Sequence, residues 1–180
     1  EEICNDDTVK AIGETGLDFN RNYSKKENQI NSFLEHIKLS NKLNLPMFLH
    51  QRDAHDIFIN CLEEIKPLNK CVVHCFTGNE NELKSYLEKD FYIGLTGWIC
   101  DPIRGAHLDK LIPLIPINRL LIETDSPYLL PKNKKIKGNR NEPIFLNEVM
   151  KKIIKLRNES REEIQNVIYK NSINFFNIQK

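Results

Sequence analysis

The chain has 180 residues, of which 40% are hydrophobic and 28% are charged. Its 26 basic and 25 acidic side chains leave a formal net charge of +1 at pH 7, so no overall electrostatic field selects a nucleic acid or a membrane as partner. No apolar run approaches the roughly 20 residues that span a bilayer. We therefore predict a single globular domain over residues 1–180. Recognition of a charged partner would depend on local patches of charged side chains.

The cysteines are odd in number and scattered among strand-like and helix-like segments. This distribution favours free thiols in a reducing compartment over a secreted disulfide scaffold. The N-terminus, "EEICNDDTVK", has neither an initiator Met nor a signal-peptide pattern and opens as though in mid-chain. We expect a cytoplasmic location, with the nucleus as an alternative, and secretion stays open because a leader would precede Glu1. The cysteines are Cys4, Cys61, Cys71, Cys75 and Cys100.

Short apolar runs alternate with longer segments of helical period along the chain. The run "VKAIGETGLDF" predicts the first strand, and residues 25–44 carry apolar side chains at helical spacing up to a stop near Pro46. "MFLH" predicts the second strand. A helix capped by Asp53 and ended by Pro67 then leads to the third strand, "CVVH".

The same alternation continues in the second half. A helix near residues 81–89 precedes the strand "FYIGLTG", and the segment 108–115 precedes the strand "RLLIETD". Parallel strands with crossover helices are therefore expected. Residues 127–143 are a Pro- and Lys-rich loop of a length that is usually functional or disordered. The tail from residue 144 predicts two amphipathic helices that cover the barrel or sheet.

Four of the five predicted strands finish on a side chain that can bind a metal. A lone strand-end histidine is more often structural, whereas an unpaired buried carboxylate is costly. Since parallel strands end on one face, four such groups at matching positions favour a shared metal site. Two imidazoles and two carboxylates suit zinc, manganese or magnesium, and the choice stays open. The four residues are Glu14, His50, His74 and Asp125.

Other candidates are weaker. Cys71, His74 and Cys75 lack the second ligand pair of a structural zinc cluster. Cys75 is a poor nucleophile candidate because neighbours on a strand point to opposite faces, away from His74. Trp98, after a strand end, either stacks on a nucleobase or packs against the protein.

Six consecutive motifs over nearly the whole chain resemble the TatD family of metal-dependent deoxyribonucleases. They are "AIGETGLDFNRNYS", "PMFLHQRDAH", "VVHCFTG", "YIGLTGWICDP", "LLIETDSPYLLP" and "RNEP". The resemblance implies an α/β fold, the TIM-type (β/α)₈ barrel of the metal-dependent hydrolase superfamily, and it implies that about three strands lie upstream of Glu1. The chain departs from the family at Gln51, where Cys is common, and at Pro102 and Ile103, where charged residues are common. Many members also carry a His-x-His pair on the first strand, a region that this chain does not include.

The same resemblance implies the activity and the roles of the site residues. The expected reaction is metal-dependent hydrolysis of DNA, as a 3′–5′ exonuclease on single strands, with one or two divalent ions per chain. Magnesium is the expected activator, with zinc or manganese as alternatives. By the resemblance Glu14 anchors or bridges the ions, His50 and His74 hold one, and Asp125 binds the other and orients or deprotonates water. Glu123 is a candidate to orient a ligand.

Basic side chains near the strand ends are candidates for phosphate contact. The expected partner is single-stranded DNA, with no membrane, and the intact barrel is expected to be monomeric. The alternatives are a hydrolase of another substrate in the same superfamily and a decayed, non-enzymatic nucleic-acid-binding barrel. The candidates for contact with substrate are Arg21, Arg52, Trp98, Lys132, Lys134, Lys135, Lys137 and Arg140.

Overall fold

The computed structural model describes residues 1–133, 135 and 138–178, and this part contains five β-strands. α-Helices separate the first four strands, and short 3₁₀-helices connect the fourth strand to the fifth. The chain divides into two compact units, one of residues 1–74 with the residues from Ile173 onward, and one of residues 75–172. All five cysteines are free thiols, as predicted. The single domain expected from the length stays a prediction.

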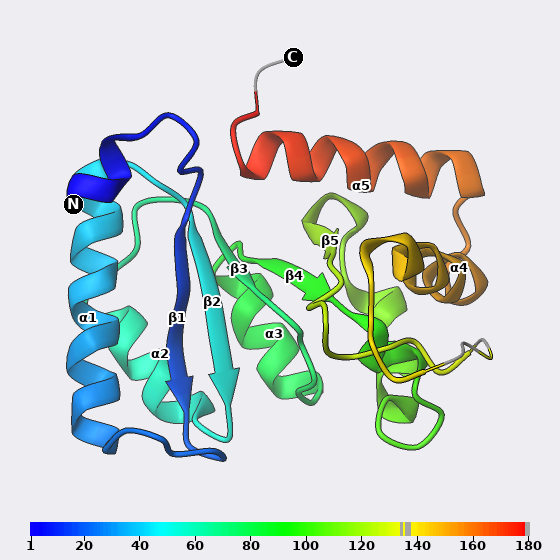
Figure 1. The fold of residues 1–180 in the computed structure, drawn as a ribbon, viewed down its shortest axis with the longest axis horizontal. Coiled ribbons are helices and arrows are strands. Elements are labelled where there is room, and N and C mark those ends of the chain that lie inside the picture. Colours follow the sequence, from blue (N-terminus) through cyan, green and yellow to red (C-terminus); the bar gives the residue numbers. More distant parts are fainter. Residues whose placement is uncertain (134, 136–137, 179–180) are drawn as a thin grey trace. The chain divides into compact units, whose positions relative to one another are not determined.

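Three parallel strands form the sheet of the first unit: β1 (Ile12–Asp18), β2 (Met47–Arg52) and β3 (Cys71–Val73). Strand β2 lies between the other two, and its residue Leu49 is in register with Val73 of β3. The apolar side chains of these strands are buried, except that of Phe48, which is partly exposed. Figure 1 shows β1 and β2 side by side, with their arrowheads at the same end.

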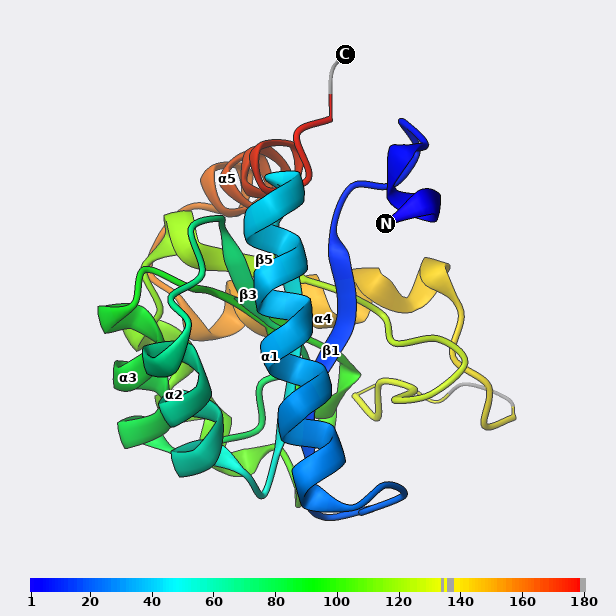
Figure 2. The same ribbon diagram turned by 90° about the vertical axis from the view of Figure 1, so that its left-hand side faces the viewer.

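Two helices of this unit follow the predicted positions. Helix α1 (Lys26–Leu43) runs alongside β1 (Figure 1, Figure 2) and buries Phe33 and Ile37. It ends at Asn44, whose left-handed backbone forms the C-cap, shortly before Pro46. Helix α2 (His55–Glu64) buries Phe58, whose ring stacks on that of Phe33 with 5.0 Å between centroids. This aromatic pair joins the two helices in the core.

The predicted cap of α2 is wrong. The N-cap residue is Ala54, and no side chain caps the helix. Asp53 instead has a positive φ of 53°, and its carboxylate accepts a hydrogen bond from the side-chain amide of Asn20, at 2.7 Å. This left-handed backbone differs from the extended conformation of an N-cap residue, so Asp53 does not cap the helix.

The second unit contains two parallel strands, β4 (Tyr92–Leu95) and β5 (Leu120–Ile122). Helix α3 (Glu80–Glu88) begins with a capping box, in which the Asn79 side chain accepts from the backbone N–H of Glu82, and Glu82 accepts from that of Asn79. The two helices predicted for the tail are α4 (Leu146–Leu156) and α5 (Arg161–Phe175). Both α4 and α5 bury isoleucines in the core.

Short 3₁₀-helices make up many of the connections. The segment between β4 and β5 contains four of them, and Pro113 lies inside the third. The guanidinium of Arg157, at the end of α4, donates to the carbonyls of Ile112 and Ile115 at 2.8 and 2.7 Å. It thereby fixes this segment against the end of α4. The 3₁₀-helices are Glu2–Asn5, Gly97–Cys100, Ala106–Lys110, Ile112–Leu114, Ile117–Arg119 and Pro143–Phe145.

The predicted loop at residues 127–143 leaves β5 and returns to α4. Asn141, which is only 2% exposed, closes this loop. Its backbone N–H donates to the carbonyl of Pro127 at 3.0 Å, and its side-chain amide donates to the carbonyls of Thr124 and Leu129 at 2.8 and 3.3 Å. The two ends of the loop are therefore tied together. Among the described residues, no helix has the length and apolar character needed to cross a membrane.

Candidate metal centre

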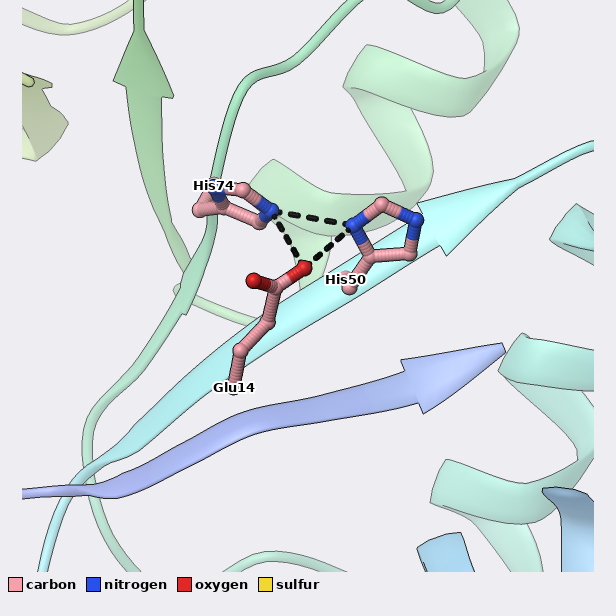
Figure 3. Close-up of side chains that lie close together, drawn as sticks. All are labelled: Glu14, His50 and His74. Carbon is pink, nitrogen blue, oxygen red and sulfur yellow. Dashed lines mark hydrogen bonds and ion pairs between the residues drawn. The ribbon is translucent and has the colours of Figure 1, made fainter. Parts of the chain in front are cut away.

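Three of the four predicted ligands meet in the first unit (Figure 3). Glu14 projects from β1, His50 from β2, and His74 directly follows β3. The Glu14 Oε1 atom lies 2.7 Å from His50 Nδ1 and 3.0 Å from His74 Nε2. The two imidazole nitrogens are 3.0 Å apart. One carboxylate oxygen and two ring nitrogens thus form a compact triangle of candidate ligand atoms.

The parallel register explains this convergence. Gly16 of β1 pairs with His50 of β2, and the β2 residue before it, Leu49, pairs with Val73, the residue before His74. Glu14 and His50 lie within their strands, whereas the sequence analysis placed them at the strand ends. An irregularity between Ile12 and Thr15 shifts the β1–β2 register close to Glu14. The long Glu14 side chain spans the remaining distance to the two rings.

The three side chains differ in how far they are exposed to solvent. His74 is 5% exposed, His50 23% and Glu14 50%. Hydrogen bonds from His50, and then from His74, hold the pKa of the Glu14 carboxyl well below its ordinary value. Glu14 is therefore ionised at neutral pH and presents a negative oxygen between the two rings.

These donor atoms fit a divalent cation. A neutral imidazole carries one proton, so the two rings can make hydrogen bonds of at most two of the three close contacts among Glu14, His50 and His74. A cation at this place satisfies all three acceptors together. Two histidines and one glutamate are also a known ligand set of catalytic zinc, in which a further position stays open for water or substrate.

Asp18 is a neighbour of this site that the sequence analysis did not single out. Its Oδ2 atom lies 3.3 Å from Nε2 of His50, on the opposite side of the ring from Glu14. Asp18 is the last residue of β1, four residues after Glu14. Because side chains alternate along a strand, this even spacing puts both carboxylates on one face, and it is the sequence signal for Asp18.

Glu123 and Asp125 belong to the second unit. The Oε1 atom of Glu123 accepts the backbone N–H of Cys75 at 2.6 Å, so Glu123 orders the residue next to His74 in sequence. The predicted strand "RLLIETD" is too long, because β5 ends at Ile122, so Glu123 and Asp125 follow the strand, and Asp125 has a positive φ of 56°. The roles of Asp125 as ligand and of Glu123 as an orienting group stay predictions.

The candidate phosphate contacts have differing surroundings. Lys132 pairs at 2.7 Å with Asp101, whose side chain is 3% exposed. Lys135 and Arg140 are exposed, and Arg140 lines an open hollow of about 410 Å³ with Ser126 and Asn141. Lys134 and Lys137 lie outside the described residues.

Three further candidates lie elsewhere. The guanidinium of Arg104 lies 4.4 Å from the ring centroid of half-buried Trp98, so this cation occupies one face of the indole. Arg21 is exposed, with its Nε 3.9 Å from Asp18, and Arg52 is a half-buried residue of β2. Contact of these residues with substrate stays a prediction.

Parallel strands that alternate with helices, together with a His–His–Glu cluster at consecutive strands, define an α/β protein of the TIM-barrel metal-dependent hydrolase class. Solved structures agree with this fold. A TatD homologue from Escherichia coli K12, named YJJV, matches with a TM-score of 0.87 and 30% identity over 95% of this chain and 65% of the other. A hydrolase TatD family protein from Entamoeba histolytica matches with a TM-score of 0.84 and 32% identity over 94% of this chain and 64% of the other.

The chain belongs to the TatD family, since the family model described as TatD related DNase matches residues 1–177. A relative in Escherichia fergusonii, named 3′-5′ ssDNA/RNA exonuclease TatD, is 46% identical over 88% of this chain and 62% of its own length. A relative of the same name in Erwinia amylovora is 48% identical over 87% of this chain and 61% of its own. The chain therefore spans less than two thirds of the length of these curated relatives. The predicted family and fold class are confirmed.

Proposed function

We propose that this chain carries the metal-binding part of a metal-dependent deoxyribonuclease that acts as a 3′–5′ exonuclease on single-stranded DNA. The observation that carries the proposal is the convergence of Glu14, His50 and His74 on one point. The names of the bacterial relatives, which include single-stranded DNA and RNA, support the substrate class.

Each residue of the cluster has a defined part in binding the cation. Glu14 contributes an ionised oxygen, and His50 and His74 contribute the ring nitrogens that face it. When bound, a divalent metal lowers the pKa of a coordinated water and neutralises charge on the phosphate oxygens. We assign Asp125 to a further ligand position and to accepting the proton of the attacking water.

The donor atoms influence which divalent ion the site prefers. Two imidazole nitrogens and one carboxylate oxygen favour zinc or manganese over magnesium, which prefers oxygen ligands. If Asp125 adds a second carboxylate, the set becomes more suitable for magnesium. We therefore propose one or two bound divalent ions, and the experiment compares zinc, manganese and magnesium.

The test is cleavage of a 5′-labelled single-stranded DNA after removal of metal by a chelator and re-addition of magnesium, manganese or zinc. We expect shortening from the 3′ end that needs the metal and stops when the 3′ end is blocked. His74→Ala and Asp125→Asn are each expected to lower the rate by roughly 100-fold or more. His36→Ala is the matched control, because His36 lies on α1 and bonds within its own helix.

Two results would contradict the proposal. Cleavage that continues at the wild-type rate in folded His74→Ala excludes the assigned role of His74. Metal-dependent hydrolysis of a small ester or of RNA without cleavage of DNA assigns the site to another substrate. The metal content of the purified protein, measured in parallel, identifies the ion that the site retains.

A further inference from the structure

The imidazole of His50 has a carboxylate on each side. Its Nδ1 atom faces Oε1 of Glu14 at 2.7 Å and Nε2 of His74 at 3.0 Å, inside the candidate metal centre. Its Nε2 atom points the other way, 3.3 Å from Oδ2 of Asp18. Both nitrogens of the ring therefore face a carboxylate, and Nδ1 also faces the ring of His74.

Asp18 is itself held in place by three other groups. Its Oδ1 atom accepts the backbone N–H groups of Asn20 and Arg21 at 3.0 and 2.7 Å. Its own backbone N–H donates to the side chain of Gln29 on α1 at 2.9 Å. The carboxylate is 19% exposed. Because Oδ1 is occupied by the turn that follows β1, Oδ2 is the oxygen left to face His50.

We propose that Asp18 is a positioning residue, which keeps the Nε2 proton on His50 and so leaves the Nδ1 lone pair directed at the metal site. Ionised Glu14 and Asp18 both accept, so they compete for the single proton of a neutral His50 ring. A cation bound beside Glu14 and His74 would exclude the proton from Nδ1, and Asp18 would then accept it from Nε2. A neutral imidazole then has its lone pair on the other nitrogen, which is the atom a cation binds. The inference rests on the proposed metal site and assigns His50 to bind through Nδ1, whereas His74 presents Nε2.

The geometry also predicts that two substitutions of Asp18 act differently. Asp18→Ala removes the acceptor and leaves the His50 tautomer free to change. In Asp18→Asn the single amide oxygen is needed by the N–H groups of Asn20 and Arg21, which turns the amide NH₂ toward His50. This donor favours the tautomer with its proton on Nδ1, which cannot bind the cation. We therefore expect Asn to impair the site at least as much as Ala.

The test has two measurements that do not depend on catalysis. Titration calorimetry with zinc is expected to give a dissociation constant roughly 10- to 100-fold higher for Asp18→Ala than for wild type, and at least as high for Asp18→Asn. Nitrogen-15 NMR of the histidine rings is expected to show a protonated Nε2 on His50 in the zinc-bound wild type and loss of this tautomer in Asp18→Asn. Asp53→Asn is the matched control, because this nearby carboxylate bonds Asn20 and its positive φ suits Asn.

The outcomes separate this inference from the proposed function. If wild type binds no zinc, manganese or magnesium, the metal site itself is wrong. If wild type binds zinc and the folded Asp18 variants bind it equally well, or if His50 carries its proton on Nδ1, the positioning role of Asp18 is overturned. Circular dichroism and thermal melting of each variant show whether a loss of affinity reflects unfolding.

Discussion

Gly16 allows β1 and β2 to approach each other at the candidate metal centre. It has a positive φ of 143°, and a Cβ atom built on it would lie 1.9 Å from the carbonyl oxygen of His50. Because the obstacle is backbone, no side-chain rotation relieves it, and β2 must shift at His50.

Gly16→Ala is therefore expected to lower the free energy of unfolding by roughly 1–3 kcal/mol and to weaken metal binding together with it. Urea denaturation and zinc titration measure the two effects. Gly138→Ala is the control, because a Cβ there meets no atom within 4 Å, although its φ of 93° still carries some strain. Equal stability of Gly16→Ala and wild type would show that the strands separate easily at this point.

At the scale of single residues, the sequence was most informative where the chemistry was unusual. Histidines and a glutamate beside apolar strands predicted three members of the cluster, because such groups are rarely placed in a core without a partner. Asp18 was harder to recognise, because a carboxylate near the end of a strand is ordinarily solvated. Its role depends on which ring nitrogen it faces, and no spacing in the sequence specifies that orientation.

Among the elements, the capping box of α3 offers a clear test of local stability. The Asn79 side chain accepts the backbone N–H groups of Asn81 and Glu82 at 2.9 and 3.1 Å. Asn79→Ala leaves both donors without this acceptor and is expected to lower the free energy of unfolding by about 1 kcal/mol. Asn79→Ser restores an acceptor and is expected to recover most of the loss. Chemical denaturation of the two variants measures the difference, and identical stability would contradict the capping role.

Asp101 links the loop after β5 to the 3₁₀-helical segment after β4, and it predicts a dependence on pH. Hydrogen bonds from Lys132, and then from Arg104, hold the pKa of this carboxyl well below its ordinary value. The unfolded chain therefore takes up a proton at a higher pH than the folded protein does. The stabilisation from Asp101 is complete above the unfolded pKa of about 3.9 and is lost as pH falls toward the lower folded pKa.

Asp101→Asn is accordingly expected to be less stable than wild type at pH 7, and the difference is expected to shrink as the pH is lowered below about 4. Urea unfolding of both proteins between pH 7 and pH 3 measures this change. A difference that stays constant over the whole range would show that the charge of Asp101 contributes nothing. Lys132→Met, which removes one partner, is expected to show a smaller effect of the same sign.

Elements with a strong apolar period were predictable, and their boundaries were less so. The helical spacing of buried residues located α1, α3, α4 and α5, because each must hide one face. The predicted cap of α2 was wrong because Asp53 has a left-handed backbone, and its carboxylate bonds Asn20, which is distant in sequence. Such a contact is tertiary, and no local pattern contains it.

On the scale of the whole molecule, the balance of charge predicts how binding of the proposed substrate, single-stranded DNA, responds to salt. A net charge of +1 supplies no long-range attraction, so the salt dependence reports the direct phosphate contacts alone. For single strands, the slope of log affinity against log salt is about −0.7 for each phosphate neutralised. Lys135→Gln and Arg140→Gln are each expected to reduce the magnitude of the slope by about this amount.

Fluorescence anisotropy with labelled DNA, in the presence of a chelator that prevents cleavage, measures the slope. Lys38→Gln on α1 is the control. An unchanged slope would remove that side chain from the binding surface.

The overall class of the chain was predictable because parallel strands bring distant residues to one edge, so that repeated strand ends carry more information than any single motif. What the sequence did not contain was the division into two compact units. Such a division depends on where contacts are dense, and therefore on packing between segments that are remote in sequence.

The hydrogen bonds of Asn141 bear on how well the 127–143 loop tolerates insertions during evolution. They close the 127–143 loop at its neck, where the side chain bonds Thr124 and Leu129 and the backbone bonds Pro127. For a loop closed in this way, doubling the length costs only about 0.6 kcal/mol. Insertions near Gly138, where the surroundings are open, would leave β5 and α4 in place. The length of this segment can therefore change while the strand and helix that carry it stay the same.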